Sequence, residues 1–243
     1  MSVPSSGPGR QLPLALRYPP DQRLHTFVAA PDAALAQLHA LAQVPGSDWI
    51  YLAGAAGVGK THLALATCAA AEDANRRAAY LPLASAAGRL REALDALDGF
   101  AVIALDNLDA IAGHRDDEVA LFDFHNRAFQ SRLHGDPVAL LYTAPVMPDA
   151  LALALPDLRS RLSHCARIAL SPLDEDGRRR VLRERAQRRG LVLDAAALDW
   201  LLRRVERDLA SLTTLLDRLD RASLAAQRRI TVPFLRATLG ADD

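Results

Sequence analysis

Residues 54–61 constrain this chain most. They read Gly-Ala-Ala-Gly-Val-Gly-Lys-Thr, which fits the pattern G-x-x-x-x-G-K-[ST] of a phosphate-binding loop. Glycines let backbone N–H groups curl around a phosphate, and the helix N-terminus that follows adds partial positive charge. Residues 49–52 predict a short apolar strand entering the loop, and residues 62–71 predict a helix leaving it. These flanks are the structural context that the pattern requires.

The two residues that end the pattern have distinct chemistry. Lys60 can reach the outer phosphates of a nucleotide as a point charge, and the Thr61 hydroxyl can ligate Mg²⁺. Lys60 is the one lysine of the chain, and the other 28 of its 29 basic residues are arginine. A compact ammonium is therefore kept where it differs functionally from a planar guanidinium. The alternative is a glycine-rich turn that binds nothing. The candidate nucleotide-binding residues here are Gly54, Ala55, Ala56, Gly57, Val58, Gly59, Lys60, Thr61 and His62.

A second candidate feature is the continuous apolar run over residues 100–106, which ends in Asp106. Such a run predicts a buried parallel strand, and α/β sheets bind ligands at the carboxyl ends of their strands. We expect Asp106 to hold Mg²⁺ together with Thr61, directly or through water. Residues 138–143 predict another apolar strand that ends in Thr143. Thr143 stands where a polar sensor of the γ-phosphate would lie, although a threonine ends strands for other reasons too.

The remaining elements predict two parts. A helix over residues 117–134 is expected to turn a core side made of Val119, Phe122, Ala128, Phe129 and Leu133 toward the sheet. Pro156 opens a short helix that extends to residue 162. After residue 173 the pattern becomes all-helical, with helices expected over residues 174–189, 194–204, 208–227 and 231–239. The sequence thus predicts a tail (1–22), an α/β domain (23–172) with a parallel sheet between helices, and a small all-α lid (173–243).

Charge and composition exclude some classes of protein. The formal net charge is zero and the pI is about 7.1, so nothing global favours wrapping nucleic acid. Two cysteines, Cys68 and Cys165, have no metal or redox spacing and are expected to be small buried residues. The sequence has neither a membrane-spanning run nor a signal-peptide pattern, so a cytoplasmic protein with no membrane partner is expected. Residues 178–189 hold seven arginines, which form either a solvated helix surface or a contact with an acidic partner or the DNA backbone.

The N-terminal part carries two segments with two interpretations each. Residues 11–16 read Gln-Leu-Pro-Leu-Ala-Leu, so Leu12, Leu14 and Leu16 point the same way in an extended conformation. This segment is either a strand docked on the domain or a linear peptide for the apolar pocket of a partner. Residues 24–28 form a lead-in that packs either on a bound base or in the core.

Several of these motifs together resemble AAA+ proteins of the DnaA replication-initiator branch, and in particular the Hda family of DnaA regulatory inactivators. The resemblance extends along nearly the whole chain, and no single short motif carries it. Its residues are 11–16, the Gly-Lys-Thr-His at 59–62, Leu-Asp-Asn-Leu-Asp-Ala-Ile-Ala-Gly at 105–113, Leu-Pro-Asp-Leu-Arg-Ser-Arg-Leu at 155–162, Leu-Asp-Arg-Leu-Asp-Arg-Ala-Ser at 216–223 and Ile-Thr-Val-Pro-Phe at 230–234.

The resemblance implies a P-loop AAA+ fold and a regulatory function. Such a protein binds ADP or ATP with Mg²⁺, docks on the DNA-polymerase sliding clamp and stimulates ATP hydrolysis by the DnaA initiator, which prevents re-initiation. Gln11, Leu12, Leu14 and Leu16 would bind the clamp, and Arg161 would be an arginine finger that acts in trans. Contact with DNA would be indirect, and homo-oligomerisation stays open. The chain also stops after the lid without the helix-turn-helix domain of the initiator, which favours a regulator.

Three departures from the family pattern bear on catalysis. Asn107 stands where hydrolysing AAA+ proteins usually have a second acid, Ala210 where a lid arginine is usual, and Pro145 where relatives have an acid. An amide can orient water but cannot act as a base, so intrinsic hydrolysis is expected to be weak. The competing hypotheses are a self-contained motor, such as a relative of helicase loaders, and a DNA-binding scaffold that uses residues 178–189.

Overall fold

A five-stranded parallel sheet lies at the centre of the larger part of the molecule. The structure is a computed structural model that describes residues 23–27, 32–204, 219 and 230–239. The strand order is β2-β3-β4-β1-β5, and every pairing is parallel. The strands are β1 Ile50–Ala53, β2 Ala78–Pro82, β3 Val102–Asp106, β4 Ala139–Ala144 and β5 Ala166–Ala169. Their apolar runs are nearly continuous because helices cover both faces of the sheet.

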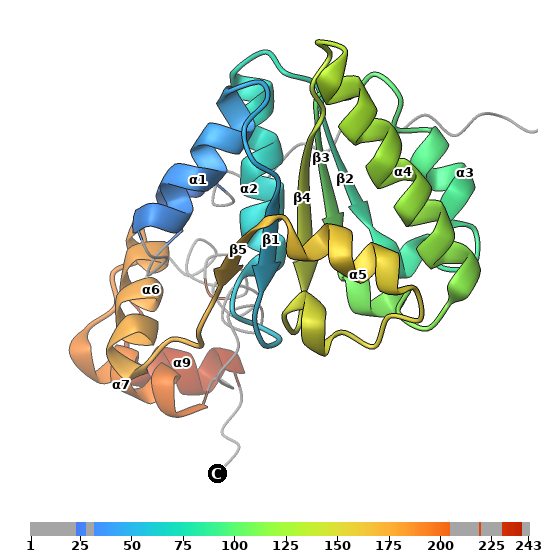
Figure 1. The fold of residues 1–243 in the computed structure, drawn as a ribbon. Helices are drawn as coiled ribbons and strands as arrows, with labels where there is room; N and C mark the ends of the chain where they lie inside the picture. The colour runs from blue at the N-terminus through green and yellow to red at the C-terminus, as the bar shows by residue number, and fades with distance from the viewer. Residues whose placement is uncertain (1–22, 28–31, 205–218, 220–229, 240–243) are drawn as a thin grey trace, which may run out of the picture.

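Each face of the sheet has its own helices and its own core. Helices α1 Asp32–Gln43 and α2 Lys60–Asp73 cover one face, and α3 Leu90–Asp95, α4 Arg115–Leu133 and α5 Pro156–Ser163 cover the other (Figure 1). Side chains along β1 alternate between these faces: Leu52 packs beneath α1 and α2, whereas Tyr51 belongs to the core on the side of α3, α4 and α5. The predicted α/β fold with a parallel sheet between helices is confirmed.

Helix α4 turns a different side toward the core than the sequence predicted. Phe129 and Leu133 are 42% and 65% exposed, so their assignment to the core is wrong. The buried side consists of Ala120, Leu121, Phe124, His125 and Ala128, preceded by two buried carboxylates, Asp117 and Glu118. The prediction followed the large apolar side chains and could not foresee that buried acids, each bonded to backbone amides of other segments, set the rotation of the helix.

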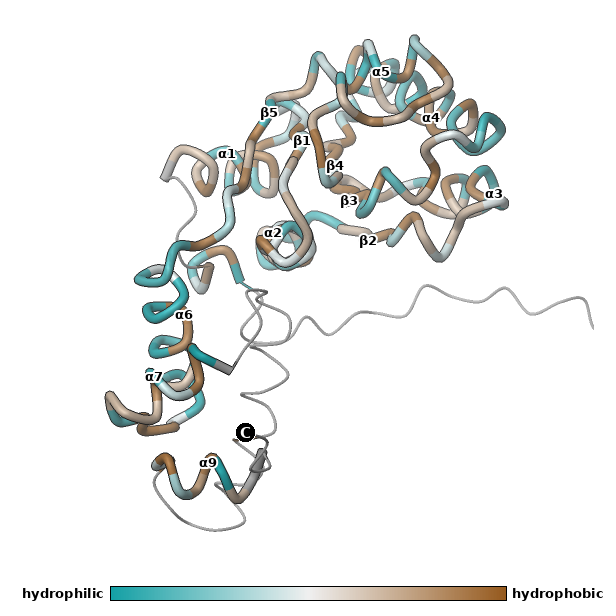
Figure 2. Tube along the Cα trace, turned by 90° about the horizontal axis from the view of Figure 1, so that it is seen from below, coloured by the Kyte–Doolittle hydropathy of each residue, from teal (hydrophilic) through white to brown (hydrophobic). Residues whose placement is uncertain are grey.

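The second part is all-helical, as predicted. Helices α6 Glu175–Arg188, α7 Ala195–Arg204 and α9 Val232–Leu239 enclose an apolar cluster of their own that includes Leu182, Leu201 and Leu235. They gather beside the sheet and not on either of its faces (Figure 2). Asp174 is the N-cap of α6, since its carboxylate accepts a hydrogen bond from the N–H of Gly177 at 2.7 Å.

Three further sequence predictions meet the structure here. Both cysteines are buried, as expected. Among the described residues, no helix combines the length and the apolar character that crossing a membrane requires. The tail (1–22), with its Gln-Leu-Pro-Leu-Ala-Leu segment, and most of the helix expected over residues 208–227, with Ala210, lie outside the described residues.

Candidate functional site

The loop between β1 and α2 lies at the carboxyl end of β1, an internal strand of the sheet, and parallel sheets bind ligands at this edge. Gly54 has no room for a side chain, since a Cβ atom there would lie 2.6 Å from the carbonyl oxygen of Leu170. Gly59 has φ of 100°, in the left-handed region that favours glycine, and it directly precedes α2. The glycines that the sequence pattern selects are therefore needed for the shape of the loop itself.

Lys60 is the first residue of α2, and its side chain bends back across the loop. Its Nζ donates hydrogen bonds to the carbonyl oxygens of Gly54 at 2.7 Å and Ala55 at 2.9 Å. Burial lowers the pKa of the ammonium, while the carboxylates of Asp106 and Asp109 act in the opposite direction. The positive charge is thus held over the loop, at the N-terminus of a 14-residue helix.

Asp106, at the end of β3, is only 3% exposed and is the hub of a hydroxyl network. Its Oδ2 accepts hydrogen bonds from Thr61 Oγ1 at 2.8 Å and from the Tyr80 hydroxyl at 2.7 Å. Its Oδ1 accepts a hydrogen bond from the Thr143 hydroxyl. Thr143 Oγ1 in turn accepts the N–H of Asn107 at 3.0 Å. The structure thus brings Thr61, Asp106 and Thr143 together, from α2 and from the ends of two strands.

These groups suit a nucleotide with Mg²⁺ in their chemistry. A carboxylate and a threonine hydroxyl are the hard oxygen ligands that Mg²⁺ prefers, and an ammonium beside a helix N-terminus suits phosphates. A carboxylate offers about four lone-pair sites, and three hydroxyls occupy three of those on Asp106. Thr61 and Asp106 could therefore hold the metal, and Lys60 and the loop amides could hold the phosphates.

Tyr80 is a site residue that sequence reasoning missed. It lies on β2, and its hydroxyl reaches the same Asp106 oxygen as Thr61. Burial first, and then the hydrogen bond to Asp106, raise the pKa of Tyr80, so that its phenol stays a neutral donor. The available signal was a tyrosine in an otherwise apolar edge strand, since a buried tyrosine usually finds a partner for its hydroxyl.

Thr143 lies deeper than a direct phosphate contact would suggest. It is fully buried, and its hydroxyl donates to the Asp106 carboxylate and accepts the backbone N–H of Asn107. In this arrangement it holds the end of β3. Asn107 is exposed and has φ of 66°, a left-handed conformation that asparagine tolerates better than most residues. The sensor role of Thr143 stays a prediction.

The sequence left open whether the lead-in before α1 packs in the core or on a bound base, and its residues differ in this respect. Leu24, in a short 3₁₀ turn (Leu24–Thr26), is 2% exposed and belongs to the core beneath α1 and α2. Phe27 lies beside His62, with ring centroids 5.2 Å apart in an edge-on arrangement. The carbonyl oxygen of Thr26 accepts a hydrogen bond from Arg188 of α6 at 3.0 Å. This segment therefore contacts both the helix that follows the loop and the lid.

Arg161 lies apart from the loop. It is exposed on α5, and the sheet separates α5 from α2 (Figure 1). Within the described part of the chain, Arg161 forms no ion pair with a carboxylate. The pKa of His125 is lowered to about 4. Burial of the ring is the main cause, and the nearby charges of Arg161 and His164 lower the pKa further. The structure thus does not bring Arg161 to the loop of its own chain.

The arginine run over residues 178–189 is not one uniform charged surface. Arg179 pairs with Asp199 at 2.7 Å and with Glu175 at 3.5 Å, while Arg188 pairs with Glu184 at 3.3 Å. Arg185 is buried. Several of these arginines therefore serve the lid and its junction with the lead-in, which weakens the DNA-scaffold hypothesis.

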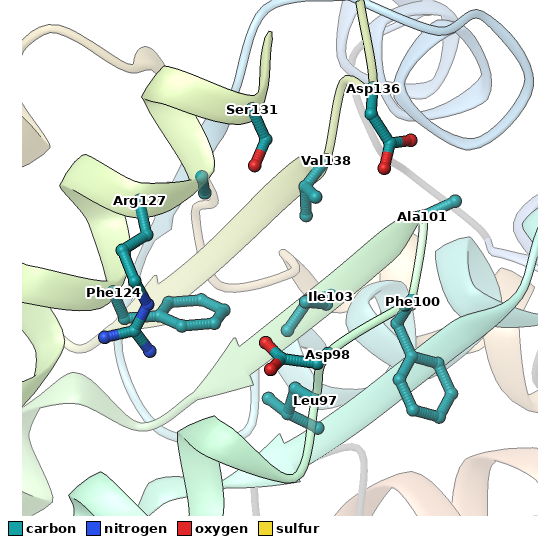
Figure 3. A pocket seen from close by; sticks show the side chains of 12 residues that line it. Leu97, Asp98, Phe100, Ala101, Ile103, Phe124, Arg127, Ser131, Asp136 and Val138 are labelled. Atoms are coloured by element: carbon teal, nitrogen blue, oxygen red, sulfur yellow. The ribbon is translucent and has the colours of Figure 1, made fainter. Parts of the chain in front are cut away.

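A surface pocket of about 210 Å³ lies away from the loop, at the amino ends of β3 and β4 (Figure 3). Phe124 and Arg127 of α4 face Leu97 and Asp98, which precede β3. Ligands of parallel sheets bind at the opposite, carboxyl edge, so this pocket is not part of the candidate site.

Comparisons with known proteins agree with the fold. The family of ATPases associated with various cellular activities (AAA) matches residues 50–162, and the lid domain of Hda matches residues 174–239. The sheet, the loop at its carboxyl edge and the helical lid thus define an AAA+ protein.

Solved structures with the same fold include two initiators and one motor. Domain III of the Thermotoga maritima replication initiation protein DnaA is 20% identical, with a TM-score of 0.74, over 92% of this chain and 98% of that chain. AMPPCP-bound DnaA from Aquifex aeolicus is 19% identical, with a TM-score of 0.67, over 85% and 67%. The Thermotoga maritima RuvB branch migration motor is 18% identical, with a TM-score of 0.67, over 90% and 71%.

At these identities the structural likeness shows the fold alone, and the two family matches carry the assignment further. The chain belongs to the AAA+ proteins related to Hda and DnaA, as the sequence motifs indicated.

Proposed function

We propose that this protein is a nucleotide-binding regulator of chromosome replication that docks on the sliding clamp and stimulates ATP hydrolysis by the DnaA initiator. The observation that carries the proposal is the match of residues 174–239 to the Hda lid, directly after an AAA match over residues 50–162. The motif at 155–162 that resembles the Hda family, with Arg161, lies in sequence between β4 and β5, ahead of this lid.

The chain would hold ADP or ATP with Mg²⁺ at the loop between β1 and α2. Lys60 and the loop amides would bind phosphate oxygens. The metal would be held by Thr61 and Asp106, whose Oγ1 and Oδ2 atoms already lie 2.8 Å apart in a hydrogen bond. The bound metal would neutralise phosphate charge. Tyr80 and Thr143 would keep the Asp106 carboxylate oriented.

Hydrolysis by the chain itself would be weak. The residue after Asp106 is an amide, and its backbone N–H is already bonded to Thr143. The nearest following carboxylate, Asp109, lies in a separate 3₁₀ turn (Leu108–Ala110) and is exposed. Among the described residues, no carboxylate directly follows Asp106 to act as a general base, and the nucleotide would serve as a structural switch.

Arg161 would act on the nucleotide of the initiator. A guanidinium that a partner supplies stabilises charge that develops on the transferred phosphoryl group. Two features support this role: Arg161 is exposed, and its helix α5 lies on the opposite face of the sheet from α2, the helix that follows the loop.

The clamp contact would be made by Gln11, Leu12, Leu14 and Leu16, which lie outside the described residues. Replacing Gln11 and Leu12 by alanine should abolish binding to the clamp and leave nucleotide binding unchanged. Clamp affinity that survived both replacements would remove this peptide from the contact. A cytoplasmic location remains a prediction.

The experiment that tests the proposal is phosphate release from purified ATP-bound initiator, with and without this protein and clamp-loaded DNA. We expect strong stimulation only when protein and clamp-loaded DNA are both present. Absence of stimulation, together with robust ATP turnover by this chain alone, would instead support a self-contained motor.

A further inference from the structure

Glu118, in the first turn of α4, is a carboxylate with no exposed surface and no cationic partner within hydrogen-bonding distance among the described residues. Its partners are three backbone N–H groups. Oε1 accepts from Gly113 at 2.7 Å and from Ala154 at 3.0 Å, and Oε2 accepts from Leu155 at 2.7 Å. An ionised group in such a place needs these bonds, because an unpartnered buried charge is strongly unfavourable.

Two of these amides belong to the start of α5. Leu155 is the residue that caps this helix, and its own side chain cannot accept a hydrogen bond. Amides at a helix N-terminus lack partners within the helix, and a polar side chain close by in sequence usually supplies one. Here Glu118, which lies 36 and 37 residues earlier, supplies both oxygens. The entry of the chain into α5 is thus set by a side chain of α4.

The third amide ties the same carboxylate to the loop after β3. Gly113 lies near the end of the segment that joins Asp106 of β3 to α4. Glu118 therefore joins the loop that leaves the candidate nucleotide site to the helix that carries Arg161. Helix α5 has only eight residues, and Arg161 lies five residues beyond Pro156. A displacement of the start of the helix would therefore move Arg161 by a similar distance.

We propose that Glu118 is a positioning residue for Arg161: it fixes the start of α5 and thereby places the guanidinium that acts on the initiator. This inference rests on the proposed function. A misplacement of about 1 Å at a reacting centre can reduce a rate by roughly 100-fold, so a small shift of α5 suffices. Glu118 itself would touch neither nucleotide nor initiator.

Asp117 provides a matched control for the loss of a buried acid. It is the preceding residue, it is 4% exposed, and it accepts the N–H groups of Gly88 at 2.7 Å and Leu90 at 3.2 Å. These amides lie at the start of α3, away from Arg161. Asp117→Asn and Glu118→Gln should therefore both lower stability, but only the second should disturb α5.

The test is a titration of ATP-bound initiator, on clamp-loaded DNA, with each full-length variant. For Glu118→Gln we expect the maximal stimulated rate to fall about tenfold, while the half-saturating concentration and nucleotide affinity change less than about twofold. Asp117→Asn should keep its maximal rate within about twofold of the unchanged protein. A folded Glu118→Gln variant with full maximal rate, or an equal loss in both variants, would overturn the inference.

Hydrogen exchange of the amides of Ala154 and Leu155 gives a readout that does not depend on the initiator. Exchange should be faster in Glu118→Gln and unchanged in Asp117→Asn, and unchanged exchange in both would overturn the inference. Glu118→Asp keeps the carboxylate but shortens the side chain, so it should also show faster exchange. This variant replaces Glu118→Gln in the test if Glu118→Gln fails to fold. If the unchanged protein gives no stimulation, the proposed function fails, and exchange alone then decides whether Glu118 holds α5.

Discussion

The two faces of the sheet carry the two candidate activities, and they are organised differently. On the α1 and α2 side, the loop, Lys60 and Thr61 are neighbours in sequence and meet Asp106 at the edge of the sheet. On the α3, α4 and α5 side, Arg161 depends on Glu118, which lies 43 positions earlier by its number and holds the start of α5. The phosphate-binding part of the first site is local in sequence, whereas the position of Arg161 is set by a separate element.

This difference teaches which functions a sequence shows directly. A local motif fixes both its shape and its chemistry, because the same glycines and the same lysine serve the fold and the ligand. A side chain whose position depends on distant contacts looks like any surface arginine until those contacts are known. Variants that affect one face alone would sharpen the comparison, and a variant that affects both would break it.

The largest expected effect is on the α5 face. Arg161→Ala should reduce stimulation of the initiator by about 1,000-fold, since an arginine finger contributes a factor of that order. The protein should keep its stability and its nucleotide affinity, because Arg161 is exposed. Single-turnover phosphate release measures the effect. Arg91→Ala, which removes an exposed arginine of α3 paired with Asp123, is the control and should change little.

The next largest effect is on the loop face. Lys60→Arg should weaken nucleotide binding by about 100-fold despite its conserved charge, because a planar guanidinium cannot replace the compact ammonium between two carbonyl oxygens. Titration with a fluorescent nucleotide measures it. Arg161-dependent stimulation that survives without bound nucleotide would show that the faces work independently. Nucleotide affinity within twofold of the unchanged protein would contradict the assigned role of Lys60.

A third prediction concerns acid stability of the core under α4. His125 donates or accepts a hydrogen bond with the Tyr142 hydroxyl at 3.0 Å, and burial lowers its pKa from 6.5 to about 4. Between these values the unfolded chain binds a proton that the folded chain does not, so stability is present above pH 6.5 and is lost as pH falls.

The free energy of unfolding should therefore decrease by roughly 2 kcal/mol between pH 7 and pH 5 through this residue. Urea unfolding at both values measures it. In His125→Gln, which cannot titrate, that part of the pH dependence should disappear. An undiminished dependence would place the responsible group elsewhere.

The smallest expected effect is at Tyr80. Tyr80→Phe removes one donor to Asp106 without changing the packing of the ring. Nucleotide affinity in the presence of Mg²⁺ should fall about tenfold, as expected for one hydrogen bond to a charged group, and affinity in EDTA should stay the same. Equal losses with and without Mg²⁺ would show that Tyr80 supports the loop and not the metal ligand.

Much of the fold could be predicted because the strands are apolar runs and the helices begin or end at clear signals. The strand that ends in Asp106, the helix that Pro156 opens and the helix that Asp174 caps all lie within a few residues of their expected positions. The orientation of helix α4 was predicted less accurately. Its rotation depends on Asp117 and Glu118, whose partners lie in other segments, whereas the periodicity argument considers only apolar side chains.

The candidate site shows the same limit. Lys60, Thr61 and Asp106 follow from local patterns, and the structure brings them together. A tyrosine in an apolar strand indicates only that the Tyr80 hydroxyl has a partner, because nothing near it in sequence shows that β2 lies beside β3 and directs this hydroxyl to Asp106. Contacts across strands become visible only once the strand order is known.

The most direct test of the central claim asks whose ATP is hydrolysed. Labelled ATP would be preloaded either on the initiator or on this protein, with unlabelled nucleotide on the other, and phosphate release would be followed on clamp-loaded DNA. The account predicts rapid release of label only when the initiator carried it, and loss of that release with Arg161→Ala. Rapid release of label from this protein would contradict it and would make the chain an ATPase in its own right.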